Sequence, residues 1–205
     1  DNQYKKVDQF GNRAKWSAGD VANLCIGQGE ITVTPLQMAV MTAAVANGGK
    51  IVQPRLVLSI NSLNSKVQSN TTIIPKKILS DLNLKNSTVS LLHQAMLADV
   101  DDSDGSGRGA RVSGLSIGGK TGTAQKKVPT GKFNPKTGSR LFRMDHITWF
   151  VSFAPVNNPK YVVVVMVESG VSGGAICAPI AGRVYRAIQK IEDSAKEGES
   201  RLAKR

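Results

Sequence analysis

Aromatic residues make up only 5% of this 205-residue chain, although hydrophobic residues as a group reach 40%. A chain of this length can form one globular core, and that core must be built mainly from Val, Ile, Leu and Ala. The longest apolar run, Tyr161–Val167, is far shorter than the roughly 20 residues of a membrane helix. The N-terminus has no apolar signal core after its charges. The chain therefore starts mid-protein, or it is soluble and unexported.

Cysteine is scarce, and no metal or cofactor site is predicted. Cys25 and Cys177 lie far apart and do not have the spacing of metal ligands. Both are flanked by small or apolar residues, which favours small buried packing residues over a disulfide or a catalytic thiol. The segment that starts at Asp99 resembles a calcium loop only at first. Asp104 stands where the loop needs Gly, and Ala110 where it needs Glu.

Positive charge is abundant and unevenly distributed, with a net charge of +12. One stretch without any acid carries six cations: Lys126, Lys127, Lys132, Lys136, Arg140 and Arg143. Aromatics are not interleaved among them as a nucleic-acid-binding surface requires, so no nucleic-acid partner is expected. We predict a solvated, mobile loop outside the core. The alternative, a positive rim that faces an anionic polymer, stays open.

The sequence predicts two helices, then three strands in succession, then a final helix. Thr34 as N-cap, followed by Pro35 and Gln37, begins a helix that is apolar nearly all round and is therefore predicted to be buried. The expected helices are Pro35–Asn47, Thr88–Val100 and Pro179–Ile191, and the expected strands are Leu115–Ala124, Thr148–Phe153 and Tyr161–Glu168. The tail 191–205 mixes charges of both signs and is expected to fray.

The tripeptide Lys120-Thr121-Gly122 carries the strongest chemical signal. Lys-Thr-Gly is the third signature of the serine transpeptidase and β-lactamase families, after Ser-x-x-Lys and Ser-x-Asn. No Ser of this chain has a Lys three positions later, so the nucleophile motif is missing. A second tripeptide, Lys136-Thr137-Gly138, lies among Pro, Gly and Lys and is interpreted as chance, as are Ser59-Ile60-Asn61 and Ser62-Leu63-Asn64.

Several further motifs occur in the order found in one family. They are Gly27-Gln28-Gly29, Thr34–Gln37, Asn47–Gly49, Gly105–Ala110, Gly119–Gln125, His146–Pro155, Lys160–Glu168 and Gly173–Pro179. Together they cover about residues 20–190, and over this span the chain resembles the C-terminal part of class B penicillin-binding proteins. The lead-in Leu141–His146 looks closest to the cell-elongation type.

The resemblance implies an α+β fold, in which helices cover both faces of an antiparallel sheet. Residues 1–190 would be a partial transpeptidase domain, mainly helical over 1–110, with the last three strands and the final helix over 111–190. Residues 191–205 would be a charged flexible tail. Strands from the N-terminal part of the domain would be missing, which leaves Tyr161–Glu168 with an unpaired apolar edge. Another segment, from the same gene product or a cleaved partner chain, would complete the sheet.

The resemblance also implies the function of a peptidoglycan D,D-transpeptidase, which cross-links stem peptides by serine acyl transfer and is acylated by β-lactams. Lys120 would supply positive charge and Thr121 a hydroxyl for the substrate's carboxylate. Gly122 would let substrate lie against the strand. Thr123 would offer its backbone N–H to the oxyanion and its hydroxyl to the carboxylate.

The family setting implies a protein at the extracytoplasmic (periplasmic) face of the inner membrane, anchored by an N-terminal helix that is not in this chain. Its partners would include the cell-wall elongation machinery. One alternative is a non-catalytic remnant of the same fold that acts as a binding or scaffold module. Another is a β-lactamase or carboxypeptidase, which shares Lys-Thr-Gly but fits the Gly27–Gly49 motifs poorly.

Overall fold

The centre of the molecule is a three-stranded antiparallel sheet in a computed structural model that describes residues 16–29, 31–61 and 71–203. Its strands are β5 (Gly118–Phe133), β6 (Arg140–Ala154) and β7 (Tyr161–Glu168), in the order β5-β6-β7. The helical elements are α1 (Ala18–Cys25), α2 (Pro35–Ala46), α3 (Asn86–Asp101), η1 (Arg108–Ala110), η2 (Gly173–Cys177) and α4 (Ala178–Ala203). Two small pairs of strands stand apart, β1 (Lys50–Val52) with β4 (Ile78–Asp81) and β2 (Ser59–Asn61) with β3 (Thr71–Ile73).

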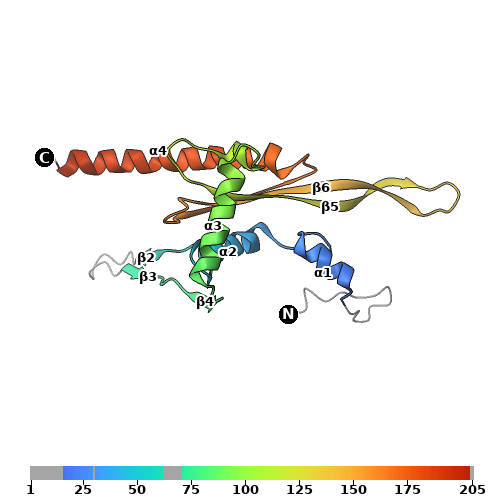
Figure 1. Cartoon of the computed structure of the whole chain (residues 1–205), viewed down its shortest axis with the longest axis horizontal. Coiled ribbons are helices and arrows are strands. Elements are labelled where there is room, and N and C mark those ends of the chain that lie inside the picture. The colour runs from blue at the N-terminus through green and yellow to red at the C-terminus, as the bar shows by residue number, and fades with distance from the viewer. Residues whose placement is uncertain (1–15, 30, 62–70, 204–205) are drawn as a thin grey trace.

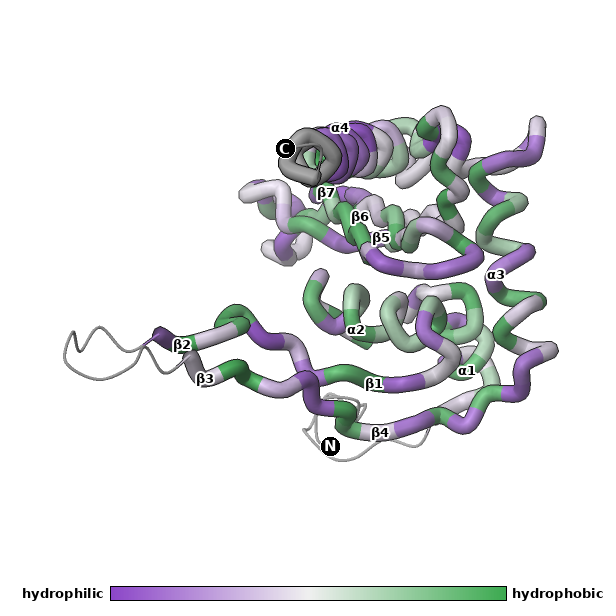
Figure 2. The backbone as a smooth tube through the Cα atoms, turned by 90° about the vertical axis from the view of Figure 1, so that its left-hand side faces the viewer, coloured by the Kyte–Doolittle hydropathy of each residue, from purple (hydrophilic) through white to green (hydrophobic). Residues whose placement is uncertain are grey.

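Helices cover both faces of this sheet, as expected for the α+β fold. α4 lies along one face and α2 along the other, while α3 crosses beside the sheet (Figures 1 and 2). On the α4 side, Tyr185 Oη donates to Ser152 Oγ at 3.1 Å. On the other side, Phe153 is fully buried against α2 and α3. Ser152 and Phe153 are neighbours on β6 but pack on opposite faces of the sheet, because side chains of a strand alternate between its faces.

The predicted helix at residues 35–47 is confirmed as α2, and its capping box is present. Thr34 Oγ1 accepts from Gln37 N at 3.2 Å, and Thr34 N donates to Gln37 Oε1 at 2.8 Å. The expected burial is wrong, however, since Leu36 is 59% and Met41 46% exposed. An apolar helix needs cover on every side to be buried. Among the described residues, only the faces toward the sheet, α3 and β1 have such cover.

Two further predictions agree with the structure in detail. α3 spans the predicted helix at residues 88–100 with short extensions at both ends, and β7 has the predicted bounds. Within the described part of the chain, β6 is the one ladder partner of β7. The other edge of β7 is therefore unpaired there, as the sequence led us to expect.

The predicted basic loop at residues 126–143 is wrong, because β5 and β6 continue through it as one long hairpin. Lys126 pairs with Asp145, and the register runs on to Phe133 opposite Arg140, with one shift after Pro129. A short turn follows, in which Asn134 N donates to the Ser139 carbonyl at 2.8 Å. Each residue added to a ladder satisfies further backbone groups, so pairing extends beyond the packed part of the strands. We call residues 126–145 the distal arm.

The predicted end of the last helix at Ile191 is also wrong, since α4 continues to Ala203. The first residues past Ile191 contact the sheet: Glu192 Oε1 accepts from Tyr161 Oη at 2.8 Å and lies 3.6 Å from Lys160 Nζ. Farther on, Lys196 lies 3.9 Å from Asp193, one turn away. The segment is rich in Ala, Glu and Lys, which favour helix over a frayed coil.

The two cysteines differ from each other. Cys177 is buried, as predicted, and its thiol donates to Thr148 Oγ1 at 3.4 Å. Cys25 is exposed, which corrects the prediction of a buried packing residue, because α1 has no buried residue at all. Both thiols are free. In the described part of the chain no helix is both long and apolar enough to cross a membrane.

Candidate active site

Lys120-Thr121-Gly122 lies on β5, at the edge of the sheet, opposite the buried part of β6. Two cavities flank this segment. One, of about 390 Å³, lies between the sheet, α2 and α3 and is lined by Lys120. The other, of about 290 Å³, lies toward η2 and is lined by Thr123. Thr121 and Gly122 border both cavities, so this short stretch of backbone is the wall between them.

The larger cavity is mostly apolar, and Lys120 is the one charged residue among those that line it. Its walls come from α2, α3 and β6: Met38, Met41, Thr42, Val45, Leu92, Ala95, Met96, Trp149 and Val151. Lys120 Nζ donates to the Thr121 carbonyl at 3.0 Å. No carboxylate of the described residues forms an ion pair with Lys120. Lys120 is itself exposed, so its charge is accessible to an anionic ligand group that enters this cavity.

The smaller cavity is lined by small and polar residues: Ser106, Thr121, Gly122, Thr123, Ser172, Gly173, Gly174 and Ala175. Ser172 caps η2, and its Oγ accepts from Ala175 N at 3.1 Å. Gly173 is required here for close approach, since a Cβ on it would lie 2.1 Å from the Trp149 carbonyl oxygen and 2.8 Å from that of Gly122. The start of η2 is thereby pressed against the backbone of the sheet.

Gln28 is a contact of this site that the sequence did not predict. Its side-chain amide donates to the Thr123 carbonyl at 3.1 Å and accepts from Gln125 N at 3.2 Å. The amide therefore imitates a neighbouring strand at the open edge of β5. Gly27 and Gly29 have φ values of 72° and 101°, which fits the predicted turn. A glutamine between two such glycines was the available signal, but its partner lies 95 residues away.

The contact to Gln28 also fixes which way the backbone of Thr123 points. In an antiparallel strand, the N–H and C=O of one residue face the same side. Because the Thr123 carbonyl faces the open edge, toward Gln28, its N–H faces that edge too. The edge beside Lys120 thus presents a backbone donor and a cation, a combination that can hold a developing oxyanion and a carboxylate.

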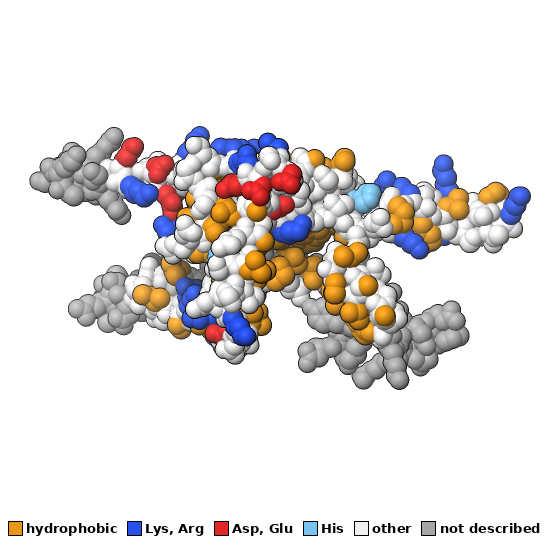
Figure 3. All heavy atoms as spheres, in the orientation of Figure 1, with side chains coloured by type: hydrophobic (Ala, Val, Ile, Leu, Met, Phe, Trp, Pro, Cys, Tyr) orange, Lys and Arg blue, Asp and Glu red, His pale blue; other side chains and the backbone are white. Residues whose placement is uncertain are grey.

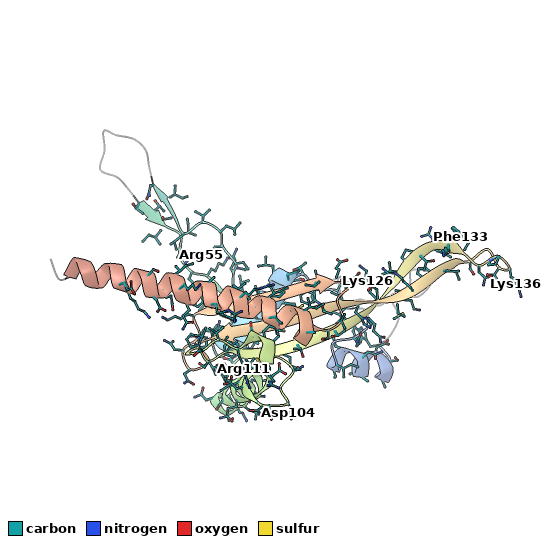
Figure 4. All side chains as sticks on the ribbon, turned by 90° about the horizontal axis from the view of Figure 1, so that it is seen from above. Arg55, Asp104, Arg111, Lys126, Phe133 and Lys136 are labelled. Carbon is teal, nitrogen blue, oxygen red and sulfur yellow. The ribbon has the colours of Figure 1, made fainter. Side chains whose placement is uncertain are left out.

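The structure separates the other sequence candidates from this edge. Lys136-Thr137-Gly138 lies in the turn at the tip of the distal arm, where Asn134 Oδ1 accepts from Lys136 N at 2.9 Å. Figure 4 shows Lys136 at the far end of the hairpin, well beyond Lys126. Ser59-Ile60-Asn61 forms β2, which pairs with β3 away from the sheet. Ser62-Leu63-Asn64 lies outside the described residues.

Comparison with known proteins gives a consistent set of relatives. Residues 5–186 match the family described as penicillin binding protein transpeptidase domain. The chain is 34% identical over 171 residues to the stage V sporulation protein D of Bacillus subtilis, covering 80% of this chain and 24% of that protein. It is also 34% identical over 174 residues to the peptidoglycan D,D-transpeptidase MrdA of Haemophilus influenzae, covering 82% and 26%. The chain thus spans about a quarter of the length of these relatives.

Solved structures give the same picture. Penicillin-binding protein 2B of Streptococcus pneumoniae aligns with a TM-score of 0.69 at 26% identity, covering 86% of this chain and 28% of that one. Penicillin-binding protein 3 of Mycobacterium tuberculosis, solved with ampicillin, aligns with a TM-score of 0.67 at 28% identity, covering 87% and 39%. These likenesses confirm the predicted α+β fold.

Proposed function

The chain belongs to the penicillin-binding protein transpeptidase domain family, and on that premise we propose that it is the C-terminal part of a peptidoglycan D,D-transpeptidase of the cell-elongation type. The protein cross-links stem peptides by serine acyl transfer and is acylated by β-lactams. The observation that carries this proposal is the open edge of β5, where Lys120 and the Thr123 N–H lie between two cavities.

Each residue of that edge has a role in the proposal. Lys120 supplies positive charge to the substrate's carboxylate, and Thr121 places a hydroxyl beside it. Gly122, without a side chain, lets the peptide lie along β5 as an added strand. Thr123 gives its backbone N–H to the oxyanion of the acyl-transfer step and its hydroxyl to the carboxylate.

The nucleophile of the proposed reaction lies outside this chain, because no Ser here is followed by a Lys at the required spacing. Three surfaces support a further segment, upstream in the same protein or on a cleaved partner chain. They are the exposed apolar face of α2, the apolar cavity above β5 and the unpaired edge of β7. Residues 1–190 would then be the C-terminal portion of the domain, with 191–205 as its tail.

The remaining features follow from the proposed chemistry. Stem peptides are cross-linked outside the cytoplasmic membrane, so the protein works at the extracytoplasmic (periplasmic) face, held by an N-terminal anchor. The cell-wall elongation machinery is its proposed setting, as the resemblance of residues 141–146 suggests. The reaction needs no cofactor. A serine serves as nucleophile, a cation binds the substrate's carboxylate, and backbone donors stabilise the oxyanion.

Labelling of the full-length protein with a fluorescent penicillin tests this function. We expect covalent labelling that unlabelled ampicillin prevents, with the acylated Ser located by peptide mapping outside residues 1–205. An acylated Ser within these residues would contradict the proposed place of the nucleophile. A folded full-length protein that takes no label would instead favour the non-catalytic binding module.

A further inference from the structure

A chain of hydrogen bonds reaches Thr121 through Ser106, which lines the smaller cavity. Ser106 Oγ donates to Asp99 Oδ1 at 2.6 Å, and the same Oγ lies 2.6 Å from Thr121 Oγ1. Asp99 belongs to the last turn of α3, and Ser106 to the connector that follows it. Three residues from different parts of the chain are thus joined side chain to side chain.

The connector holds Asp99 in one place. The Asp99 carbonyl accepts from Gly107 N at 2.8 Å, and Asp99 Oδ1 also accepts from Ser106 N at 3.2 Å. A Cβ on Gly105 would lie 2.3 Å from the Asp99 carbonyl oxygen, and one on Gly107 would lie 2.7 Å from Asp99 Oδ2. Only glycine fits this closely against Asp99. The connector therefore fixes the carboxylate beside Ser106.

The other oxygen of this carboxylate has no partner. Asp99 Oδ2 is buried and has no hydrogen bond to any of the described residues. Both contacts of the carboxylate with donors come from Ser106, through its backbone N–H and its hydroxyl. Because an unpartnered buried carboxylate oxygen is costly, Asp99 depends on its two bonds from Ser106, and the one from the hydroxyl, at 2.6 Å, is the shorter.

The direction of the hydrogen bonds follows from the chemistry of the three groups. Ser106 has a single hydroxyl proton, and its Oγ donates that proton to Asp99 Oδ1. Ser106 Oγ then meets Thr121 Oγ1 as an acceptor, and Thr121 must donate. The proton of Thr121 points to Ser106, and only lone pairs of Thr121 remain for a ligand.

We infer that Asp99 and Ser106 are positioning residues that hold the Thr121 hydroxyl proton away from the substrate's carboxylate. This inference rests on the proposed function. While the bond from Thr121 to Ser106 is intact, Lys120 and Thr123 hold the substrate's carboxylate, and Thr121 faces it only with lone pairs. Thr121 can donate to the carboxylate only after its bond to Ser106 breaks, so the pair weakens the binding of ligands that carry a carboxylate at this place.

Ser106→Ala in the full-length protein tests the inference, because it removes the acceptor of the Thr121 proton. The rate of acylation by a penicillin is measured over a range of concentrations. We expect the half-saturating concentration to fall about ten-fold, as suits one released hydrogen bond to a charged group, while the limiting rate stays the same. The methyl ester of the same penicillin lacks the carboxylate and should show no change.

Ser106→Thr keeps a hydroxyl and should restore the wild-type value, and Ser103→Ala in the same connector is the matched control. A half-saturating concentration that stays the same or rises in Ser106→Ala overturns the inference, as does an equal gain for the methyl ester. In each of these cases the wild type is still acylated, and the proposed function stands. If penicillin fails to acylate the wild type, the proposed function is overturned and this inference with it.

Discussion

The two halves of the β5–β6 hairpin are paired in one antiparallel ladder, with a single shift after Pro129, but they differ in what surrounds the backbone. In the half that lies between the helices, β6 is buried continuously from Phe150 to Ala154. In the distal arm, Phe133 and Phe142 are 58% and 56% exposed. Figure 3 shows the arm projecting from the body of the molecule with Lys and Arg side chains around it. Backbone pairing makes both halves strands, but only the half that is packed against helices borders the two cavities.

Each half also carries a Lys-Thr-Gly tripeptide, which makes the comparison unusually direct. The one at Lys120 lies between two cavities, and the one at Lys136 lies in an exposed turn. Because the three residues are identical, any difference in their chemistry must come from their surroundings. Aromatic and acidic residues of the hairpin should likewise contribute to stability according to what surrounds them.

Among the stability changes, truncation of an aromatic side chain should differ most between the two halves. Phe150 is fully buried, so Phe150→Ala should lower the free energy of unfolding by about 3–5 kcal/mol. Phe142→Ala, in the distal arm, should change it by no more than about 0.5 kcal/mol. Urea unfolding of the complete domain measures both. Similar losses for the two variants would mean that the arm packs as part of the core.

The junction of the two halves should show a smaller, pH-dependent effect at Asp145. Its Oδ2 accepts from Ser169 Oγ at 2.7 Å and its Oδ1 from His146 N at 2.9 Å. These bonds, with the charge of Arg143 at 3.3 Å, hold the pKa of Asp145 below its ordinary value of 3.8. A lowered folded-state pKa means stabilisation that is complete above pH 3.8 and is lost as the pH falls through the lower folded value.

Asp145→Asn should therefore have a lower melting temperature than the wild type at neutral pH, and the gap should close as the pH falls below 3.8. Glu168→Gln is the matched control, because the ion pair of Glu168 with Lys126, at 3.7 Å, is exposed and contributes little. If the difference in melting temperature between Asp145→Asn and the wild type did not change with pH, the charge of the carboxylate would play no part in stability.

Removal of the arm should have the smallest effect on stability. Residues 129–142 can be replaced by Asn-Gly, which suits a two-residue hairpin turn and keeps Val128 opposite Arg143. The melting temperature of the complete domain should hardly change, because the deleted part buries little. A drop as large as that of Phe150→Ala would show that the arm is part of the fold's core.

Sequence patterns predicted the features that neighbouring residues determine, such as helix starts and strand bounds. They missed the features that contacts between distant parts of the chain determine. The start of α2 at Thr34 and the bounds of β7 were readable, because a capping box and a β-branched run are local signals. The arm was missed because it lacks alternating apolar residues and is paired by extension of the packed half. The burial of α2 was misjudged because burial depends on what covers a helix.

The candidate site shows the same division. Lys120 and its neighbours were found from a tripeptide and the motifs around it. Gln28 reaches this strand from 95 residues away, and Ser106, with Asp99, reaches it from the connector that precedes it; no periodicity encodes these side-chain contacts. Such contacts appear only when the fold brings the segments together.

Acylation of variants of the two tripeptides decides whether the β5 edge is the substrate-binding wall. Lys120→Ala and Lys136→Ala are made in the full-length protein, and the second-order rate of acylation by fluorescent penicillin is measured for each. Loss of the Lys120 charge beside the cavities that flank β5 should lower the rate by roughly two to four orders of magnitude, while loss of Lys136 in the turn of the distal arm should leave it unchanged. Equal effects of the two substitutions would contradict the assignment of the β5 edge as the substrate-binding wall.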